Sequence, residues 1–364
     1  MENRKKSPNA VVAICYDFDK TLSVQDMQNY GLISKLGWKV SDFWNASNAF
    51  AKTQKMDKIL SYMKLIVEES EKARVHVSIG DFHNLGKSIK LFPGVDTWFD
   101  RINAFGQDQG VEIQHYIISA GLKEIIEGTS IAKYIKKVFA SEFVYDDRSG
   151  WPVWPKQVVN YTTKTQYLYR ISKQCLDLSD DKSVNEPVPD EERAIPFSNF
   201  IYVGDSETDI PAMRVVTKNG GCSIGVYNEA ECNLGHVISL KRSERINCFA
   251  PANYEKDENL ERIVKKTISK IAVEKELIDY DNGQKRIIER VFDEIDYLFK
   301  FYSANLSYES RGLITDEMLA TVKSNILKTL EDMKDWDCIK VADCVISRDA
   351  RKFIDSKIKE LDSL

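Results

Sequence analysis

The sequence lacks any apolar run near the roughly 20 residues that a membrane-spanning helix needs. Its basic start, MENRKKSPNA, is followed by an apolar segment that is too short and too rich in β-branched residues for the core of a signal peptide. Internal repeats and low-complexity segments are also missing. We therefore expect no membrane among the partners of this protein.

Paired cysteines and a strong charge of one sign are missing too. The seven cysteines include no CxxC pair, and an odd number cannot all form disulfides within one chain. This pattern favours a reducing environment, so we expect a cytoplasmic protein. The formal net charge of −5 gives little attraction for nucleic acid, which is therefore not expected as a partner either.

The chain does contain an alternation of short apolar runs with segments of helical periodicity, over about its first 255 residues. The expected strands are residues 10–16, residues 111–121, and the segments NFIYVGD and GGCSIGVY. The expected helices lie in residues 24–90, in VDTWFDRI after the turn at Pro93 and Gly94, in residues 122–137 and in TTKTQYLYRISKQC, where Thr162 or Thr163 is the expected N-cap. A hairpin is expected in FVYDDRSGWPVW, with its turn at Asp147–Gly150. This alternation predicts an α/β fold with a Rossmann-like parallel sheet and helices on both faces.

The remaining sequence predicts an inserted loop and a helical C-terminal region. Residues 179–198 are acidic and contain prolines, which is typical of an exposed loop. Beyond residue 255 the pattern is helical, with apolar stripes formed by Ile287, Val291, Ile295, Leu298 and Tyr302, and by Leu319, Val322, Ile326 and Leu330. We expect three parts: a core domain of residues 1–23 and 91–255, a helical insertion of residues 24–90, and an extension of residues 256–364. The extension could pack on the core domain or form a homodimer.

Two aspartates follow the first expected strand directly. In an extended segment Asp17, Asp19 and Thr21 point the same way, so two carboxylates and a hydroxyl would meet beyond the strand end. Like charges so close repel by roughly 1 kcal/mol in water and by more where water is scarce. A surface turn would also accommodate these residue types, but it offers nothing that offsets the repulsion.

A second pair of acids follows the strand in YVGDSETDI. Asp205 comes directly after this strand, and Asp209 lies one helical turn further on. A helix N-cap would explain Asp205 or Ser206 without any catalysis. The carboxyl ends of parallel strands face one ligand site, however, so Asp17, Asp19, Asp205 and Asp209 could form one oxygen-rich cluster. Carboxylate oxygens suit Mg²⁺, which would offset the repulsion.

Ser119 and Lys164 are candidates for binding an anion near these acids. Ser119 ends the strand in YIISAG, and Lys164 begins a helix whose N-terminal amides also favour anions. Ser119 could equally be a simple cap, and Lys164 an exposed lysine. Lys156 and Lys173 are the alternatives to Lys164, which is preferred for its position at a helix start.

The four segments CYDFDKTL, YIISAG, NYTTKTQYL and YVGDSETDI resemble, in order and context, the four motifs of the haloacid dehalogenase-like hydrolase superfamily. The resemblance covers roughly residues 10–235, and the helical insertion resembles the cap of its phosphoserine phosphatase-like branch. It implies a Mg²⁺-dependent phosphatase that acts on a small phosphorylated metabolite. The second aspartate of the first motif is typical of the phosphatases and phosphomutases of the family.

The resemblance also implies a role for each motif residue. Asp17 would be the nucleophile that forms an aspartyl-phosphate, and Asp19 the general acid and base. The metal would be held by Asp17, the backbone carbonyl of Asp19, Asp205 and, through water, Asp209. Thr21, Ser119 and Lys164 would bind the substrate phosphate, with Thr21 also orienting Asp17.

The expected cap lacks one residue that is typical of the phosphoserine phosphatase-like branch. Gln25 and Asp26 stand where a cap glutamate would grip the ammonium group of phosphoserine, which puts that substrate in doubt. The aromatic residues Trp38, Phe43 and Trp44 could line the pocket or simply pack the core, whereas Trp151 and Trp154 would brace the hairpin. Two other functions stay open: phosphoryl transfer to a second substrate, as in a phosphotransferase or phosphomutase, and non-catalytic sensing of a phosphorylated ligand.

Overall fold

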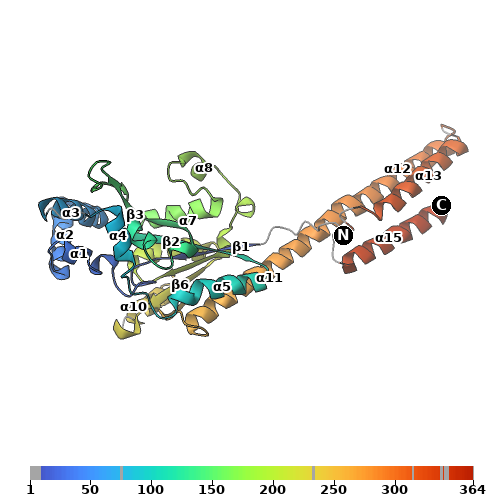
Figure 1. The fold of residues 1–364 in the computed structure, drawn as a ribbon. Helices are drawn as coiled ribbons and strands as arrows, with labels where there is room; N and C mark the ends of the chain where they lie inside the picture. Colours follow the sequence, from blue (N-terminus) through green and yellow to red (C-terminus); the bar gives the residue numbers. More distant parts are fainter. Residues whose placement is uncertain are drawn as a thin grey trace. The chain divides into compact units, whose positions relative to one another are not determined.

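The computed structural model describes residues 10–73, 77–231, 234–313, 315–336, 339 and 344–363 (Figure 1). The chain forms two compact units, Met1–Ala272 and Val273–Leu364. The basic residues 1–9 and the cysteines at 232 and 338 lie outside the described residues. Cys15, Cys175, Cys222 and Cys248 are free thiols. No helix of the described ranges combines the length and the apolar character needed to cross a membrane.

A seven-stranded sheet forms the centre of the first unit, with the order β4-β3-β2-β1-β5-β6-β7. The strands are β1 (Val11–Tyr16), β2 (Glu112–Leu122), β3 (Ile135–Tyr145), β4 (Pro152–Gln157), β5 (Phe200–Gly204), β6 (Cys222–Tyr227) and β7 (Cys248–Pro251). All neighbours are parallel except β3 and β4, which form the predicted hairpin. Tyr16 at the end of β1 pairs with Val203 near the end of β5 and with Ile117 in the middle of β2, so the ends of β1 and β5 lie side by side and β2 extends beyond them.

Helices cover both faces of this sheet. The helices of this unit outside the insertion are α5 (Val95–Asp108), α6 (Lys123–Glu127), α7 (Thr163–Lys173), α8 (Asp181–Asn185), α9 (Ile210–Lys218), α10 (Leu234–Arg242) and α11 (Asn259–Ile287), and short 3₁₀ turns lie between them. All of these helices except α8, which has no buried residue, contribute to the packing. Val12 and Ile14 of β1 face one apolar cluster, and Ala13 and Cys15 face another. The first cluster includes residues of α5, and the second includes residues of α7 and α9. Helices α5 and α7 lie on opposite sides of the sheet in Figure 1. The α/β class with a parallel, doubly covered sheet is thereby confirmed.

The predicted helical insertion is helical in the structure. It contains η1 (Met27–Asn29), α1 (Leu32–Lys35), α2 (Val40–Gln54), α3 (Lys58–Ala73) and α4 (Ile79–Gly86). Gly86 approaches α6 so closely that a Cβ atom there would lie 2.2 Å from the carbonyl oxygen of Ile125. This contact between α4 and α6 requires a residue without a side chain.

The aromatic residues of the insertion belong to its packing. Phe43 is fully buried and makes edge contacts with the rings of Trp38 and Trp44. The indole nitrogens donate hydrogen bonds to Glu69 and Asn29, at 3.0 and 3.2 Å. Core packing, one of the two interpretations drawn from the sequence, therefore describes all three rings.

Local periodicity misled the prediction between the second and third strands. The helix expected at residues 122–137 ends after Glu127, and β3 begins at Ile135. The apolar residues here have a spacing that fits either state, and pairing with β2 decides for a strand. Strand β7 was missed because a run of four residues is too short to identify in the sequence.

The segment expected as an exposed loop, residues 179–198, contains α8 and two 3₁₀ turns. The buried guanidinium of Arg170 anchors its start, donating hydrogen bonds to the carbonyl oxygens of Asp177 and Asp180, at 2.7 and 3.0 Å. The segment is therefore more ordered than its composition suggested.

The boundary of the C-terminal region also lies later than expected. The sequence indicated a boundary after residue 255, whereas the first compact unit continues to Ala272. The reason is that Leu260, Val264 and Ile268 of α11 pack into the core of the sheet unit.

The second unit is a helical bundle of the last part of α11, η7 (Ile288–Phe292, a π-helix), α12 (Asp293–Ser310), α13 (Asp316–Met333) and α15 (Cys344–Ser363). Its core contains Ile287, Val291, Ile295, Leu298 and Tyr302, so the first predicted stripe is confirmed. Ile326 and Leu330 of the second stripe are buried, and Leu319 and Val322 pack against them. The predicted helical C-terminal region is confirmed.

Candidate active site

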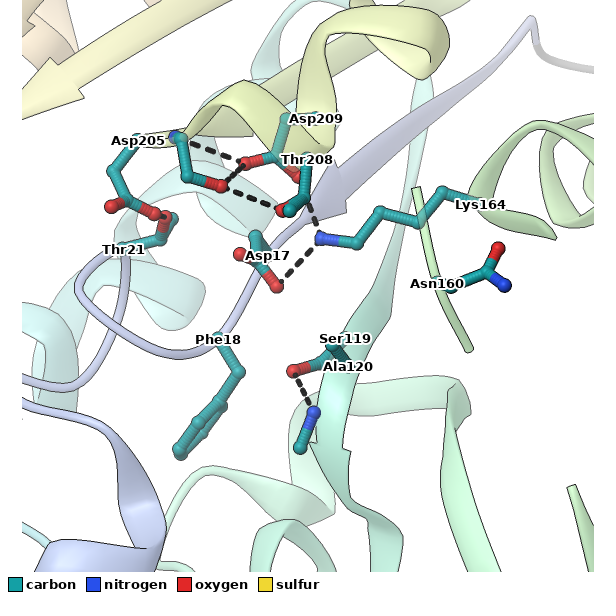
Figure 2. A network of polar contacts seen from close by, with 12 residues as sticks. Asp17, Phe18, Thr21, Ser119, Ala120, Asn160, Lys164, Asp205, Thr208 and Asp209 are labelled. Atoms are coloured by element: carbon teal, nitrogen blue, oxygen red, sulfur yellow. Dashed lines mark hydrogen bonds and ion pairs between the residues drawn. The ribbon is translucent and has the colours of Figure 1, made fainter. Parts of the chain in front are cut away.

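The predicted acids meet at the carboxyl ends of two neighbouring strands. Asp17 directly follows β1, where its backbone N–H donates to the carbonyl oxygen of Val203 at 2.9 Å, and Asp205 directly follows β5. One carboxylate oxygen from each of Asp17, Asp205 and Asp209 lies within 4.8 Å of the others (Figure 2). The carboxylate of Asp19 does not belong to this group.

Lys164 lies between two of these carboxylates. Its ammonium is 3.0 Å from Oδ1 of Asp17 and 2.7 Å from Oδ1 of Asp209, and its side chain is fully buried (Figure 2). The alternative lysines lie elsewhere: Lys156 pairs with Glu142, and Lys173 donates to backbone carbonyls. The structure thus brings Lys164 to the acids.

The helix that carries Lys164 begins as predicted. Thr162 occupies the N-cap position but makes no capping bond with its side chain. Instead, Oδ1 of Asn160 accepts hydrogen bonds from the N–H groups of Thr162 and Thr163, at 3.1 and 3.0 Å. Thr162 thus holds the predicted N-cap position, and the longer Asn160 side chain supplies the capping hydrogen bonds from just outside the helix.

Asp209 is held by groups that the sequence did not single out. The hydroxyl of Tyr202 donates to Oδ1 of Asp209 at 2.8 Å, and the hydroxyl of Ser206 donates to Oδ2 at 3.0 Å. The spacing of Ser206 and Asp209 is that of a capping box and could have been recognised. Nothing in the sequence distinguishes Tyr202 from the other apolar residues of β5.

The two hydroxyls expected near the phosphate have different partners. Thr21 donates to Oδ1 of Asp205 at 3.0 Å, so in this structure it orients Asp205 and not Asp17, contrary to the prediction. Ser119 is buried within β2, and its oxygen accepts a hydrogen bond from the N–H of Gly121 at 3.1 Å. Figure 2 shows Ser119 next to Asp17 on the neighbouring strand.

Asp19 lies beside the helical insertion. Its Oδ1 accepts a hydrogen bond from the backbone N–H of Met27 at 2.7 Å. Burial raises its pKa well above the usual range, and the charges of Asp26 and Asp17 add to the rise. The carboxylate of Asp26 is itself 3.2 Å from the ammonium of Lys20. A raised pKa suits a carboxyl group that gives up its proton as a general acid.

Burial also shifts the pKa values of the clustered groups. It raises the pKa of Asp17 to about 6, with a further rise from Asp209 and an opposing effect of Lys164. Burial followed by the charges of Asp17 and Asp209 raises the pKa of Asp205. Burial alone would lower the pKa of Lys164, but the two adjacent carboxylates reverse this and raise it. The single ammonium therefore leaves excess negative charge when the three acids are ionised.

This donor set fits a magnesium ion. Mg²⁺ takes hard oxygen ligands and is usually bound by one or two carboxylates together with water and substrate phosphate. Asp17, Asp205 and Asp209 supply carboxylate oxygens within reach of one ion. A divalent cation would also balance the excess negative charge that Lys164 leaves.

Comparison with known proteins gives a family match. The model of a family described as haloacid dehalogenase-like hydrolase matches residues 14–214. An uncharacterized protein of Borreliella burgdorferi is 27% identical in an alignment of 282 residues, which covers 69% of this chain and 94% of that protein.

Solved structures are similar at low identity. A substrate-bound phosphoserine phosphatase is 16% identical, with a TM-score of 0.45, over 72% of this chain and 99% of that chain. A probable phosphoserine phosphatase from Vibrio cholerae is 13% identical, with a TM-score of 0.46, over 74% and 69%. A hydrolase of the same family from Salmonella enterica is 18% identical, with a TM-score of 0.42, over 61% of this chain and only 64% of that one. Similarities at this level assign neither substrate nor mechanism.

Proposed function

The chain belongs to the haloacid dehalogenase-like hydrolase family, and from that premise we propose that it is a Mg²⁺-dependent phosphatase of small phosphomonoesters. Asp17 is the proposed nucleophile and Asp19 the proposed general acid and base. The observation that carries the proposal is the buried cluster in which Lys164 bridges Asp17 and Asp209 beside Asp205. A buried excess of carboxylates is costly in a structural role, but it suits a site that binds a cation and a phosphoryl group.

In the first step, a carboxylate oxygen of Asp17 attacks the phosphorus atom of the substrate. A bond forms between this oxygen and phosphorus, and the ester bond to the leaving oxygen breaks. Asp19 gives its proton to that oxygen, so the alcohol leaves as a neutral product. The raised pKa of Asp19 supports this role, and the hydrogen bond from Met27, although it opposes that rise, fixes the orientation of the carboxyl group.

In the second step, Asp19 takes a proton from a water molecule whose oxygen attacks the phosphorus. The bond between phosphorus and Asp17 breaks, which releases inorganic phosphate and restores both carboxyl groups. Lys164 stays next to Asp17 throughout and balances negative charge on the transferred group. Thr21 keeps Asp205 in place through its hydrogen bond, and the hydroxyl of Ser119 is proposed to contact a phosphate oxygen.

Asp17, Asp205 and Asp209, with the backbone carbonyl of Asp19, are the proposed holders of Mg²⁺. When bound, the ion would neutralise charge on the phosphoryl oxygens and polarise the phosphorus centre.

We propose that the helical segment 24–90 is a cap over the site, like the cap of the phosphoserine phosphatase-like branch. Such a cap favours a small substrate. Two contacts support this assignment: Met27 donates to Asp19, and the hydroxyl of Tyr62 donates to the carbonyl oxygen of Ala120 at 2.8 Å. Asp26 already pairs with Lys20, so it is a poor candidate for binding a substrate ammonium group. Phosphomonoesters without an amino group are therefore preferred candidates.

Phosphate release from a panel of small phosphomonoesters, including phosphoserine, tests the proposal. We expect release by the full chain with Mg²⁺, none with EDTA, and none from Asp17→Asn. Asp108→Asn makes the same chemical change at an exposed helix end and should behave like the wild type. Activity in Asp17→Asn equal to the wild type would refute the nucleophile. Release that requires an added acceptor would indicate a phosphotransferase, and tight phosphate-ester binding without turnover would indicate a sensor.

A further inference from the structure

One face of helix α12 is buried in the core of the second unit. Ile295, Leu298 and Tyr302 are buried in the core of that unit, together with residues of α13 and α15. The face is continuous with the buried residues Ile287 and Val291 that precede α12.

The same helix carries a second stripe on a different face, which we call the aromatic stripe. It consists of Asp293, Tyr297, Phe301, Ala304 and Tyr308 of α12 and of the C-cap residue Arg311, at steps of four, four, three, four and three residues. Steps of three and four residues keep side chains on one side of a helix and are typical of helix-pairing seams. All six residues are exposed, and Tyr297, Phe301 and Tyr308 retain 62%, 45% and 48% exposure.

Exposed large apolar side chains scattered singly are ordinary on a protein surface. Here three aromatic residues lie on one helical face instead, bounded by an acid at one end and a base at the other. Tyr297 and Phe301 already stack, with ring centroids 6.3 Å apart. Such a surface is typical of an interface with another protein segment.

The order of residues in the aromatic stripe makes it complementary to itself. Reversing its direction aligns Asp293 with Arg311, Tyr297 with Tyr308, and Phe301 with Ala304. Opposite charges then meet at both ends, and a large ring faces a small side chain on each side of the centre. We propose that the aromatic stripe pairs with the same stripe of a second copy of this chain, antiparallel and about a two-fold axis between residues 301 and 304.

The alternative arrangements fit the stripe less well. A parallel pair would place Asp293 against Asp293 and Arg311 against Arg311, and would face Phe301 with itself. An isologous interface also closes at two copies, because each partner contributes the same surface. The charge pattern thus favours a second copy over an unrelated helix, and it favours a dimer. The inference does not depend on the proposed phosphatase activity.

Sedimentation equilibrium of the full chain tests the pairing directly. We expect a monomer–dimer equilibrium in the wild type. Asp293→Arg should raise the dimer dissociation constant about tenfold, because both ends then carry two like charges. The double variant Asp293→Arg with Arg311→Asp should return it to within about threefold of the wild type. Phe301→Ala should raise it by about a hundredfold, since the ring is lost from both copies.

Controls separate pairing from folding. Asp296→Arg makes the same charge change on α12 away from the aromatic stripe and should leave the dimer intact. Every substituted residue is exposed, so the circular dichroism of each variant should match the wild type. A strictly monomeric wild type would overturn the proposal. So would a dimer that Asp293→Arg and Phe301→Ala leave unchanged, or a double charge swap that fails to restore pairing.

Discussion

The two units bury different kinds of side chain. Among the described residues, the buried polar and charged side chains all lie between Asp17 and Glu261, in the sheet unit. The core of the helical unit is apolar among its described residues, and its ion pairs join exposed or half-buried side chains, as with Lys285 and Asp281. The sheet unit thus retains groups that the helical unit excludes from its interior.

Burial of charge does not by itself identify an active site. Glu261 is buried to 1% exposure, but Arg101 and Lys265 both contact its Oε1, at 2.8 and 3.4 Å, and this pairing is structural. The Asp17 cluster has the opposite balance, because one ammonium faces several carboxylates. An excess of like charge is what a folded protein avoids unless a ligand balances it. The comparison therefore indicates that the Asp17 cluster is the reactive site of the sheet unit. Matched substitutions in the two units test this interpretation.

The largest expected effect is on turnover. Asp19→Asn removes the proposed proton donor, and we expect phosphate release to fall by about 10²- to 10⁴-fold. Asp281→Asn makes the same change on the surface of the helical unit and should leave turnover unchanged. Initial rates on the best substrate of the panel measure both. Equal rates for Asp19→Asn and the wild type would remove Asp19 from the mechanism.

The next effect is on stability. Lys164→Met leaves Asp17 and Asp209 buried without a cation, which should cost about 3–5 kcal/mol of unfolding free energy in EDTA. Lys285→Met breaks an exposed pair in the helical unit, which water screens, and should cost far less. Urea unfolding followed by circular dichroism gives both values. Similar costs for the two variants would show that the buried cluster has no special electrostatic role.

The pH dependence of stability gives a smaller effect of known sign. The folded protein raises the pKa of Asp17 to about 6, so it binds this proton more tightly than the unfolded chain does. In EDTA, the stability of the wild type relative to Asp17→Asn should therefore be highest at low pH and fall as pH rises from about 4 to about 6, by about 2–3 kcal/mol. Urea unfolding at a series of pH values measures this difference. A difference that stays constant or grows with pH would contradict the shift.

The sequence was sufficient for the strand-end acids and for the class of fold. Asp17 and Asp205 each follow a buried β-rich run directly, and parallel strands must bring such positions to one edge. The helical periodicity of the C-terminal region was equally informative, since one stripe of residues had to be buried.

Other features depend on contacts between distant residues and could not be found in this way. The bond from Thr21 to Asp205 joins residues 184 positions apart, so it could not be read from the local sequence, and the resemblance had implied Asp17 as the partner instead. Tyr202 contacts Asp209 from inside a strand that reads as uniformly apolar. Strand β3 was mistaken for the end of a helix because its pairing with β2, and not its own pattern, fixes its conformation.

The smallest expected effects come from replacing one glycine in each unit by alanine. The two replacements should change the stability of the protein in opposite directions. Gly86 of α4 contacts backbone atoms near α6, and a Cβ there would lie 2.2 Å from the carbonyl oxygen of Ile125, which cannot move without shifting the chain. Gly86→Ala should therefore destabilise the sheet unit by about 1–3 kcal/mol. Gly283 lies inside α11 with no atom within 4 Å of the same position. Gly283→Ala should stabilise the protein by about 0.5–1 kcal/mol, because alanine loses less backbone entropy in a helix. Thermal unfolding followed by circular dichroism compares the two variants, and if both shift the melting temperature in the same direction, the close packing of α4 on α6 is not as described here.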